Sequence, residues 1–393
     1  MAEAIQLMNH HFGRLEKLRR HREGERREAE LKLQSAILRG FGGRFCAVIR
    51  EHHLQTPTAP VSFAELQARA QHLDLFRKCG EVSVVHLQRK HDGSCRVVTS
   101  PSRSIRCRQR LLGQVLNARF GEPSDEFNIA GKGRDAAVLR VKNMIEQEGA
   151  RAIVAFDIED YFPSVKPKHL GWVRIPTPVL NHTLFFNRRA TLFKKGPTGK
   201  AEAARQGLSQ GASASGKIAS ALLGRELRHV TGDLGKVIYV DDGIIGACAP
   251  PDANAIAKTL AKRMAELNGG PLSFRYLKCL DVQQGFSFLG YWFRVAVDSN
   301  DAQVTLTPSH TAFVRCRQRL FARLKKMQPE WDAAEAIAEE HVKAWRRAFS
   351  LWLPDSVEEV DLNARVLSWL DDWFHGCTKK PGKPLLGTIS APV

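Results

Sequence analysis

Acidic residues come directly after apolar runs at two places in this chain. Asp157 follows the run AIVAF, and Asp241 and Asp242 stand between VIYV and GII. Short apolar runs of this kind are typical of buried strands, so each carboxylate is expected where a buried strand reaches the surface. Clustered carboxylates repel one another and are costly to bury unless a cation lies between them. The pattern therefore predicts a sheet with a cation site where its buried strands reach the surface.

Mg²⁺ is the cation that such oxygen ligands suit, because it binds one or two carboxylates and completes its shell with water and substrate phosphates. Two such ions about 3.5–4 Å apart catalyse in-line phosphoryl displacement. The alternative is structural: the segment Asp241–Asp242–Gly243 contains an Asp-Gly pair, which favours a type I′ hairpin turn. The acidic positions alone leave both interpretations open.

The chain is strongly basic. Its 393 residues contain 59 Lys and Arg against 41 Asp and Glu, a formal net charge of +18. A surplus of this size favours a polyanionic partner, most often nucleic acid, although a basic soluble protein without such a partner is the alternative. Residues 315–326 (RCRQRLFARLKK) carry basic and no acidic side chains, which favours contact with a phosphate backbone there.

Cysteine usage and apolar runs bear on the cellular compartment. The eight cysteines are scattered, whereas disulfide frameworks and zinc ribbons need close, paired spacing. No window approaches about 18 uninterrupted apolar residues, and the first residues lack a secretory pattern. We therefore expect reduced thiols in a cytoplasmic protein with no membrane partner.

The pattern of elements changes along the chain. Residues 1–80 and 309 to about 375 have a helical pattern. Between them, strand-like runs alternate with helical stretches at 105–119, 135–148, 217–229 and 252–267, and hairpins are predicted around Asp92–Gly93 and Asp241–Gly243. Residues 377–393 are basic and rich in Pro and Gly, which indicates an unstructured tail. Strands interrupted by helices indicate an α+β fold.

Seven segments stand in a characteristic order. They are KHDGSCRVVTSPSRSIRCRQRLL (90–112), FNIAGKGRDAAV (127–138), FDIEDYFPSV (156–165), LSQGASASGKIAS (208–220), YVDD (239–242), a lysine at 278 and FSFLGYWF (286–293). With these segments the chain resembles bacterial retroelement reverse transcriptases, the branch of retrons and group II introns. The last five look like motifs A, B, C, D and E of that family, and the first two resemble motifs of its fingers. The resemblance covers roughly residues 85–295.

The resemblance implies a right-hand polymerase fold. Residues 1–80 would form a helical N-terminal extension, 81–308 the fingers and an antiparallel-sheet palm, 309–376 a helical thumb, and 377–393 a flexible basic tail. The implied activity is RNA-directed DNA polymerisation, a nucleotidyl transfer that uses an RNA template and dNTPs and makes DNA.

Site residues follow from the same resemblance. Asp157 and Asp241 would bridge two Mg²⁺ ions, for which Mn²⁺ could substitute, with Asp242 in support and the Ile158 carbonyl as a further ligand. The residues that would bind the nucleotide are Arg96 at the triphosphate, Phe162 under the sugar, Gln210 and Gly211 against nucleotide and template, and Lys278 as proton donor to pyrophosphate. A bulky ring at Phe162 would clash with a 2′-OH and so favour dNTPs. For Lys278 a plain surface lysine is the alternative.

Two segments would hold the primer and its duplex. Phe288, Leu289, Gly290 and Tyr291 would form the primer grip, although an aromatic core strand is an interpretation that can hold alongside it. In 309–326 the residues Phe313, Cys316, Leu320 and Leu324 share one helical face, and HVKAWRRAFSLWL (341–353) is a plausible packing partner for it. Beside that face runs a stripe of Arg315, Arg319, Arg323 and Lys326, expected to bind nucleic acid, with a solvated basic face as the alternative.

Two departures from the family pattern bear on the lineage. Ser215 is followed by Gly216 where motif B commonly has proline, and Asp135 stands where retrons and group II introns have a serine. We therefore place the chain nearest the unknown-group and defence-associated reverse transcriptases, working with a dedicated structured non-coding RNA and with a role in antiphage defence. A second copy of the chain or an accessory protein is a further partner that the sequence leaves open.

Two other functions compete with this interpretation. One is a nucleotidyl transferase that extends an end without a template, and the other is a non-catalytic palm that binds structured RNA. The three intact aspartates favour catalysis, since a decayed site has no need of clustered acids.

Overall fold

The computed structural model describes residues 2–19, 26–55, 60–89, 95–186, 191–193, 206–297, 302–353 and 356–378. They belong to two compact units, Met1–Val282 and Gln283–Val393. None of the helices in this part of the chain is long and apolar enough to cross a membrane.

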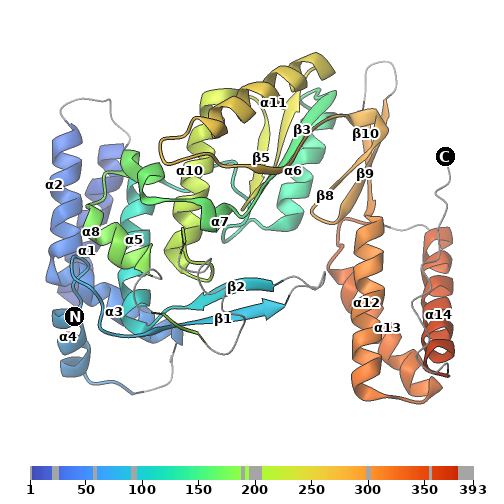
Figure 1. Cartoon of the computed structure of the whole chain (residues 1–393), viewed down its shortest axis with the longest axis horizontal. Helices are drawn as coiled ribbons and strands as arrows, with labels where there is room; N and C mark the ends of the chain where they lie inside the picture. Colours follow the sequence, from blue (N-terminus) through green and yellow to red (C-terminus); the bar gives the residue numbers. More distant parts are fainter. Residues whose placement is uncertain are drawn as a thin grey trace. The chain divides into compact units, whose positions relative to one another are not determined.

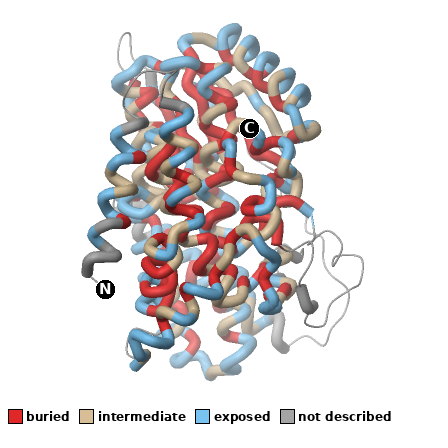
Figure 2. The backbone as a smooth tube through the Cα atoms, turned by 90° about the vertical axis from the view of Figure 1, so that its left-hand side faces the viewer, coloured by how far each residue is buried: buried red, intermediate tan, exposed pale blue. Residues whose placement is uncertain are grey.

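Helices form the beginning of the first unit. They are α1 (Ala2–Arg19), α2 (Arg26–Arg39), α3 (Phe41–Gln55) and α4 (Phe63–His72), and α1, α2 and α3 pack against the later helix α5 (Arg103–Phe120) (Figure 1). Leu15, Phe45 and Leu111 are fully buried in this helical cluster, where the backbone alternates between buried and exposed positions as amphipathic helices require (Figure 2). The helical pattern predicted for residues 1–80 is confirmed.

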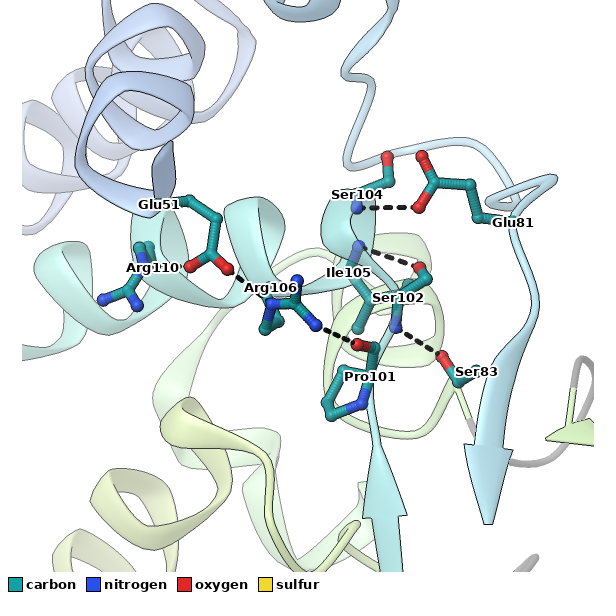
Figure 3. A network of polar contacts seen from close by, with 9 residues as sticks. All are labelled: Glu51, Glu81, Ser83, Pro101, Ser102, Ser104, Ile105, Arg106 and Arg110. Atoms are coloured by element: carbon teal, nitrogen blue, oxygen red, sulfur yellow. Dashed lines mark hydrogen bonds and ion pairs between the residues drawn. The ribbon is translucent and has the colours of Figure 1, made fainter. Parts of the chain in front are cut away.

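A polar network ties α3 to the start of α5. The buried carboxylate of Glu51 on α3 pairs with Arg106 and Arg110 of α5, and Arg106 also donates 2.7 Å to the carbonyl of Pro101 (Figure 3). Ser102 caps α5 by accepting the Ile105 N–H at 3.3 Å. Because Pro101 directly follows strand β2 (Cys95–Ser100), this network fixes the end of that strand to the N-terminal helices.

A three-stranded sheet contains the two strands that come before α5 and one strand that comes after it. β1 (Ser83–Arg89) pairs antiparallel with β2 (Cys95–Ser100) and parallel with β4 (Thr191–Phe193). The predicted hairpin is confirmed in its strands, whereas its turn around Asp92–Gly93 lies outside the described residues.

The second sheet of this unit has the order β5-β6-β3-β7, with every neighbouring pair antiparallel. Its strands are β3 (Ala152–Ile158), β5 (Lys236–Tyr239), β6 (Asp242–Ala247) and β7 (Phe274–Asp281). Helices α10 (Ser213–Thr231) and α11 (Pro250–Ala265) share a core with β3, and α6 (Arg134–Glu146) packs on β5 and β6 (Figure 1). Short helices α7 (Tyr161–Ser164) and α8 (Thr177–Thr183), with the 3-10 turns η1 (Pro167–Val173) and η3 (Val282–Gln284), complete the connections. Helices mixed with antiparallel sheets agree with the predicted α+β class.

The second unit is a small antiparallel sheet and three helices. The sheet has the order β10-β9-β8, made of β8 (Phe286–Phe288), β9 (Tyr291–Val297) and β10 (Ala302–Pro308). The helices are α12 (His310–Met327), α13 (Trp331–Arg347) and α14 (Ser356–Thr378). α14 extends to Thr378, two residues into the stretch predicted as a tail, and residues 379–393 lie outside the described part.

Candidate active site

Strand pairing brings two of the predicted acidic side chains together. Asp157, near the end of β3, is the cross-strand partner of Asp242, the first residue of β6. Directly paired residues place their side chains on the same face of a sheet, and here the Asp157 carboxylate adds to the effect of burial in raising the pKa of Asp242. Asp157 is only 7% exposed, so this pair lies where the sheet passes from core to surface.

The third acid lies in the hairpin turn. β5 ends at Tyr239 and β6 begins at Asp242, so Val240 and Asp241 make a two-residue turn. The predicted alternative, an Asp-Gly turn, is wrong: Asp242 and Gly243 belong to the strand. Gly243 is needed there because a Cβ would lie 2.2 Å from the ring of Phe156.

Val240 carries an unusual backbone conformation in that turn. Its φ is +67°, in the left-handed region that β-branched residues rarely adopt. Such strain is kept only where the surroundings enforce it, and it clusters at functional sites. The Ile158 N–H donates 3.1 Å to the carbonyl of Asp241, which fastens the turn to the end of β3. The turn and the predicted ligand Ile158 are thus adjacent.

Two residues of β7 contact the acidic pair, and sequence reasoning missed both. Tyr276, the partner of Asp157 in the β3–β7 register, donates its hydroxyl to Asp242 at 3.0 Å. Arg275 pairs with Asp157 at 3.2 Å. Both stand near Lys278 in the segment SFRYLKCL, but only the register of β7 against a strand over 100 residues earlier reveals their contacts.

The electrostatics of the pair favour binding of a positive charge. Burial, followed by the neighbouring Asp157 carboxylate, raises the pKa of Asp242 to about 7, and the Tyr276 hydroxyl opposes this rise. Burial and the Asp242 carboxylate in turn raise the pKa of Tyr276 above its ordinary value. Two close carboxylates with one elevated pKa share a proton when no cation is bound, and a divalent cation can take the place of that proton.

The residues fit a metal that completes its shell from the substrate. In the described part of the chain no three His, Cys, Asp or Glu side chains form a closed metal cluster. Asp157 and Asp242 supply two carboxylates, while Asp241 lies close enough to raise the pKa of Asp242 further. Mg²⁺ is commonly bound by one or two carboxylates together with substrate phosphates and water, so an open pair suits it.

The motif B loop lies against β2. The Thr99 N–H of β2 donates 2.8 Å to the carbonyl of Gln210, and Gly211 has φ +93°. A Cβ on Gly211 would lie 2.7 Å from the Thr99 carbonyl, so glycine is required for this close approach. Arg96 also lies on β2, opposite Gln88, and its side chain is outside what the structure describes.

Phe162 borders a pocket that reaches Val240 of the Val240–Asp241 turn. The pocket measures about 320 Å³ and is lined by Phe162, Val240, the loop before α6 and one side of α10. The carbonyl of Phe162 accepts the Leu208 N–H at 2.8 Å, which joins α7 to the loop that carries Gln210. Phe162, Gln210 and the Asp241 turn therefore surround one region of the first unit.

Lys278 lies on the same sheet face as the carboxylates. It pairs with Ala155, two residues before Asp157, and is exposed. Its ammonium lies 5.9 Å from the centre of the Tyr276 ring. From this face the Lys278 ammonium can contact an anion bound near the acidic pair. A plain surface lysine is equally compatible with this position.

The predicted primer-grip segment lies in the second unit, at the β8–β9 turn. Leu289 (φ +49°) and Gly290 (φ +88°) form the turn, and the Gly290 carbonyl accepts the Ser309 N–H at 2.8 Å. Phe288 and Tyr291 are buried, so the core-strand interpretation holds for their side chains. Trp292 belongs to the predicted primer-grip segment FLGYW (288–292), and unlike Phe288 and Tyr291 it is an exposed aromatic ring of this hairpin.

Helix α12 has the predicted apolar face. Cys316, Leu320 and Leu324 are buried, and the ring of Phe313 lies 5.0 Å from that of Trp345 on α13. On the basic stripe, Arg315, Arg319 and Lys326 are exposed, whereas Arg323 is ion-paired with Glu340 of α13. The segment 341–353 is thus the packing partner that the sequence suggested.

Comparison with known protein families gives a match. A family model described as "Reverse transcriptase (RNA-dependent DNA polymerase)" matches residues 88–293, more than half of the 393 residues. The matched span begins in β1, ends in β9 and includes the acidic pair, the Val240–Asp241 turn and the motif B loop. None of the curated proteins compared with the chain matches it.

Proposed function

Because the chain belongs to the reverse transcriptase family, it is an RNA-directed DNA polymerase, and we propose that its reaction depends on Mg²⁺ held by Asp157, Asp241 and Asp242. The observation that carries this proposal is the cross-strand pair of Asp157 and Asp242 at the ends of two central strands of a buried sheet, where burial and the Asp157 carboxylate raise the pKa of Asp242 to about 7. The adjacent carbonyl of Ile158 is a further candidate ligand, and Mn²⁺ is a chemically similar substitute.

In this reaction the primer 3′-oxygen forms a bond to the α-phosphorus of a dNTP, and pyrophosphate leaves. When bound, two Mg²⁺ ions supply activation of the attacking hydroxyl and neutralisation of charge on the leaving oxygen. Asp157 and Asp242 would hold the positive charge of the ions in place. Arg275 and Tyr276 contact the two carboxyls and orient them. Lys278, exposed on the same face, is proposed to give a proton to pyrophosphate.

The nucleotide is proposed to lie between β2, the motif B loop and Phe162. Arg96 would hold its triphosphate, since a guanidinium matches phosphate geometry. Gln210 and Gly211 would contact nucleotide and template, and the ring of Phe162 would exclude a 2′-OH. The backbone contact between Thr99 and Gln210 supports this arrangement, because it holds the two segments side by side.

We assign residues 81–308 to fingers and palm, 309–376 to the thumb, 1–80 to an N-terminal extension and 377–393 to a basic tail. Leu289 and Gly290 present the backbone of the primer grip, and the stripe Arg315, Arg319, Arg323 and Lys326 would follow the duplex. The partner that the charge of +18 favours is a structured non-coding RNA, in a cytoplasmic enzyme of the defence-associated branch.

A double substitution tests the metal assignment. Asp241→Ala together with Asp242→Ala is expected to abolish incorporation of dNTPs on an RNA template, because the cation loses its ligands. Asp233→Ala, at an exposed aspartate in the turn before β5, is the matched control and is expected to keep activity. A folded double variant that still polymerises would show that the reaction is catalysed elsewhere.

A further inference from the structure

The sheet of the second unit has one buried and one exposed face. Phe286, Phe293 and Leu306 form one buried row, and the side chains that alternate with such rows face outward. The outward side chains are Ser287, Trp292, Arg294, Ala296, Gln303, Thr305 and Thr307. None of the described residues on this outer face is acidic, so the face is polar and basic around a single large ring.

Trp292 is that ring. It is 36% exposed, although tryptophan is usually well buried, and it lies in one cross-strand row with Ser287 and Thr307. A Cβ placed on Gly285 would lie 2.7 Å from the Trp292 ring, so the ring rests against the backbone of that glycine. An exposed aromatic ring on a sheet, flanked by hydroxyl groups, is a surface on which unpaired bases stack.

Two arginines line one pocket together with Thr307, the cross-strand neighbour of Trp292. Arg294, two residues along β9, lines a pocket of about 180 Å³ together with Thr307 of the outer face and Arg365 of α14. The Arg365 guanidinium lies 5.2 Å from the centre of the Phe313 ring. Asp361 also lines the pocket, so its charged groups are two cations and one anion. Among the described residues Arg294 has no ion-pair partner, which leaves its guanidinium available to a phosphate.

We propose that the outer face of β8, β9 and β10 is a binding site for single-stranded nucleic acid. One base stacks on Trp292, and a neighbouring phosphate is held between Arg294 and Arg365. The Cα atoms of Trp292 and Arg294 are two residues apart on one strand, about 6.6 Å. The inference rests on the proposed function only for the class of ligand. It concerns the face opposite to the buried Phe288 and Tyr291, not the primer-grip turn.

The chemistry of the face selects this ligand over others. Duplex bases are paired and stacked on each other, so only an unpaired base offers its ring face to Trp292. A protein partner would need a larger apolar area than one ring, since interface cores gather several apolar side chains. The cations of the pocket match a phosphate backbone, whose charge binds arginine forks strongly.

Binding of a short unpaired oligonucleotide to the full chain tests the site. Trp292→Ala is expected to weaken binding of a twelve-nucleotide uridine oligomer about five- to hundredfold, the range that stacking of one base on one ring provides. Arg294→Ala and Arg365→Ala are each expected to lower the slope of log Kd against log salt by about 0.7. Trp292→Phe keeps a stacking ring and is expected to stay within about threefold of the parent chain.

Two substitutions in the same unit serve as controls. Trp331 is comparably exposed, at 39%, and lies on α13, and Arg347 is exposed at the end of that helix. Trp331→Ala and Arg347→Ala are expected to leave binding unchanged. Binding that Trp292→Ala leaves unchanged, or that the two controls weaken equally, would overturn the proposal.

A crosslinking measurement separates this site from the polymerase centre. An oligomer that carries 5-iodouridine is expected to crosslink to the peptide containing Trp292, and crosslinks confined to the first unit would overturn the proposal. Uridine and thymidine oligomers distinguish an RNA strand from a DNA strand as the natural source. If the chain polymerises but these results fail, the inference alone is wrong. If they hold in a chain that does not polymerise, the proposed reaction is wrong and the site stands.

Discussion

Replacing Asp242 by asparagine should stabilise the metal-free protein at neutral and alkaline pH. Burial and the Asp157 carboxylate raise the pKa of Asp242 from 3.8 to about 7, so the folded state keeps a proton that the unfolded state releases near pH 4. The folded state then binds more protons than the unfolded state between about pH 4 and pH 7, and stability contributed by this group falls as pH rises through that window. The variant removes this loss.

The size of the effect follows from the same shift. A displacement from 3.8 to about 7 spans about 3 pH units, which at 1.36 kcal/mol per unit amounts to at most about 4 kcal/mol. Asparagine can keep the polar contacts, since its oxygen accepts the Tyr276 hydroxyl and its amide can donate to Asp157. We therefore expect Asp242→Asn to raise the free energy of unfolding by about 2–4 kcal/mol at pH 8 and by little at pH 4.

Urea unfolding in EDTA at several pH values measures this difference. Asp233→Asn, at an exposed turn residue, is the control and should show no pH-dependent difference from the parent. Adding Mg²⁺ should stabilise the parent chain more than the variant, because the variant lacks one of the three carboxylates proposed to bind it. A difference between variant and parent that does not change with pH would refute the account of the paired acids.

Three further predictions concern the nucleotide, the N-terminal helices and the thumb. Phe162→Val should raise the kcat/KM for rNTPs relative to dNTPs by about tenfold or more, since the ring excludes the 2′-OH, and an unchanged ratio would remove it from sugar selection. Glu51→Gln should raise the KM for dNTPs by up to about tenfold with kcat little changed, because Glu51 holds the end of β2 through Arg106. Glu226 is another buried acid between two arginines, and Glu226→Gln should leave the KM unchanged. Arg319→Glu with Arg323→Glu should leave single-nucleotide addition intact but shorten products made in the presence of a trap, and full-length products would mean that the stripe does not hold the duplex.

Much of the site could be predicted because short segments of the sequence carry its pattern. The apolar runs before Asp157 and Asp241 indicated strands. The carboxylates of these aspartates indicated a cation site at the ends of those strands. The pairing of Asp157 with Asp242 agrees with that reasoning. The spacing of three and four residues between Phe313, Cys316 and Leu320 likewise predicted which face of α12 is buried.

Other features depend on register and packing, which local sequence does not specify. Tyr276 and Arg275 contact the acidic pair only because β7 pairs with β3 in one register, with a bulge after Asp157. The Asp242–Gly243 pair was expected in the turn, yet Val240 and Asp241 form the turn, two residues earlier, and Gly243 lies in the strand over the Phe156 ring. Propensity favoured the wrong position, and side-chain packing decided the right one.

The central claim concerns synthesis directed by an RNA template. The most direct measurement offers the full chain one dNTP at a time on primed RNA templates that differ only in the first unpaired base. The account predicts that the complementary nucleotide alone is added in each case, in the presence of Mg²⁺, and that Asp241→Ala with Asp242→Ala adds none. Addition of the same nucleotide whatever the template base would contradict it and identify a template-independent transferase, and no addition by the parent chain would leave a palm that only binds RNA.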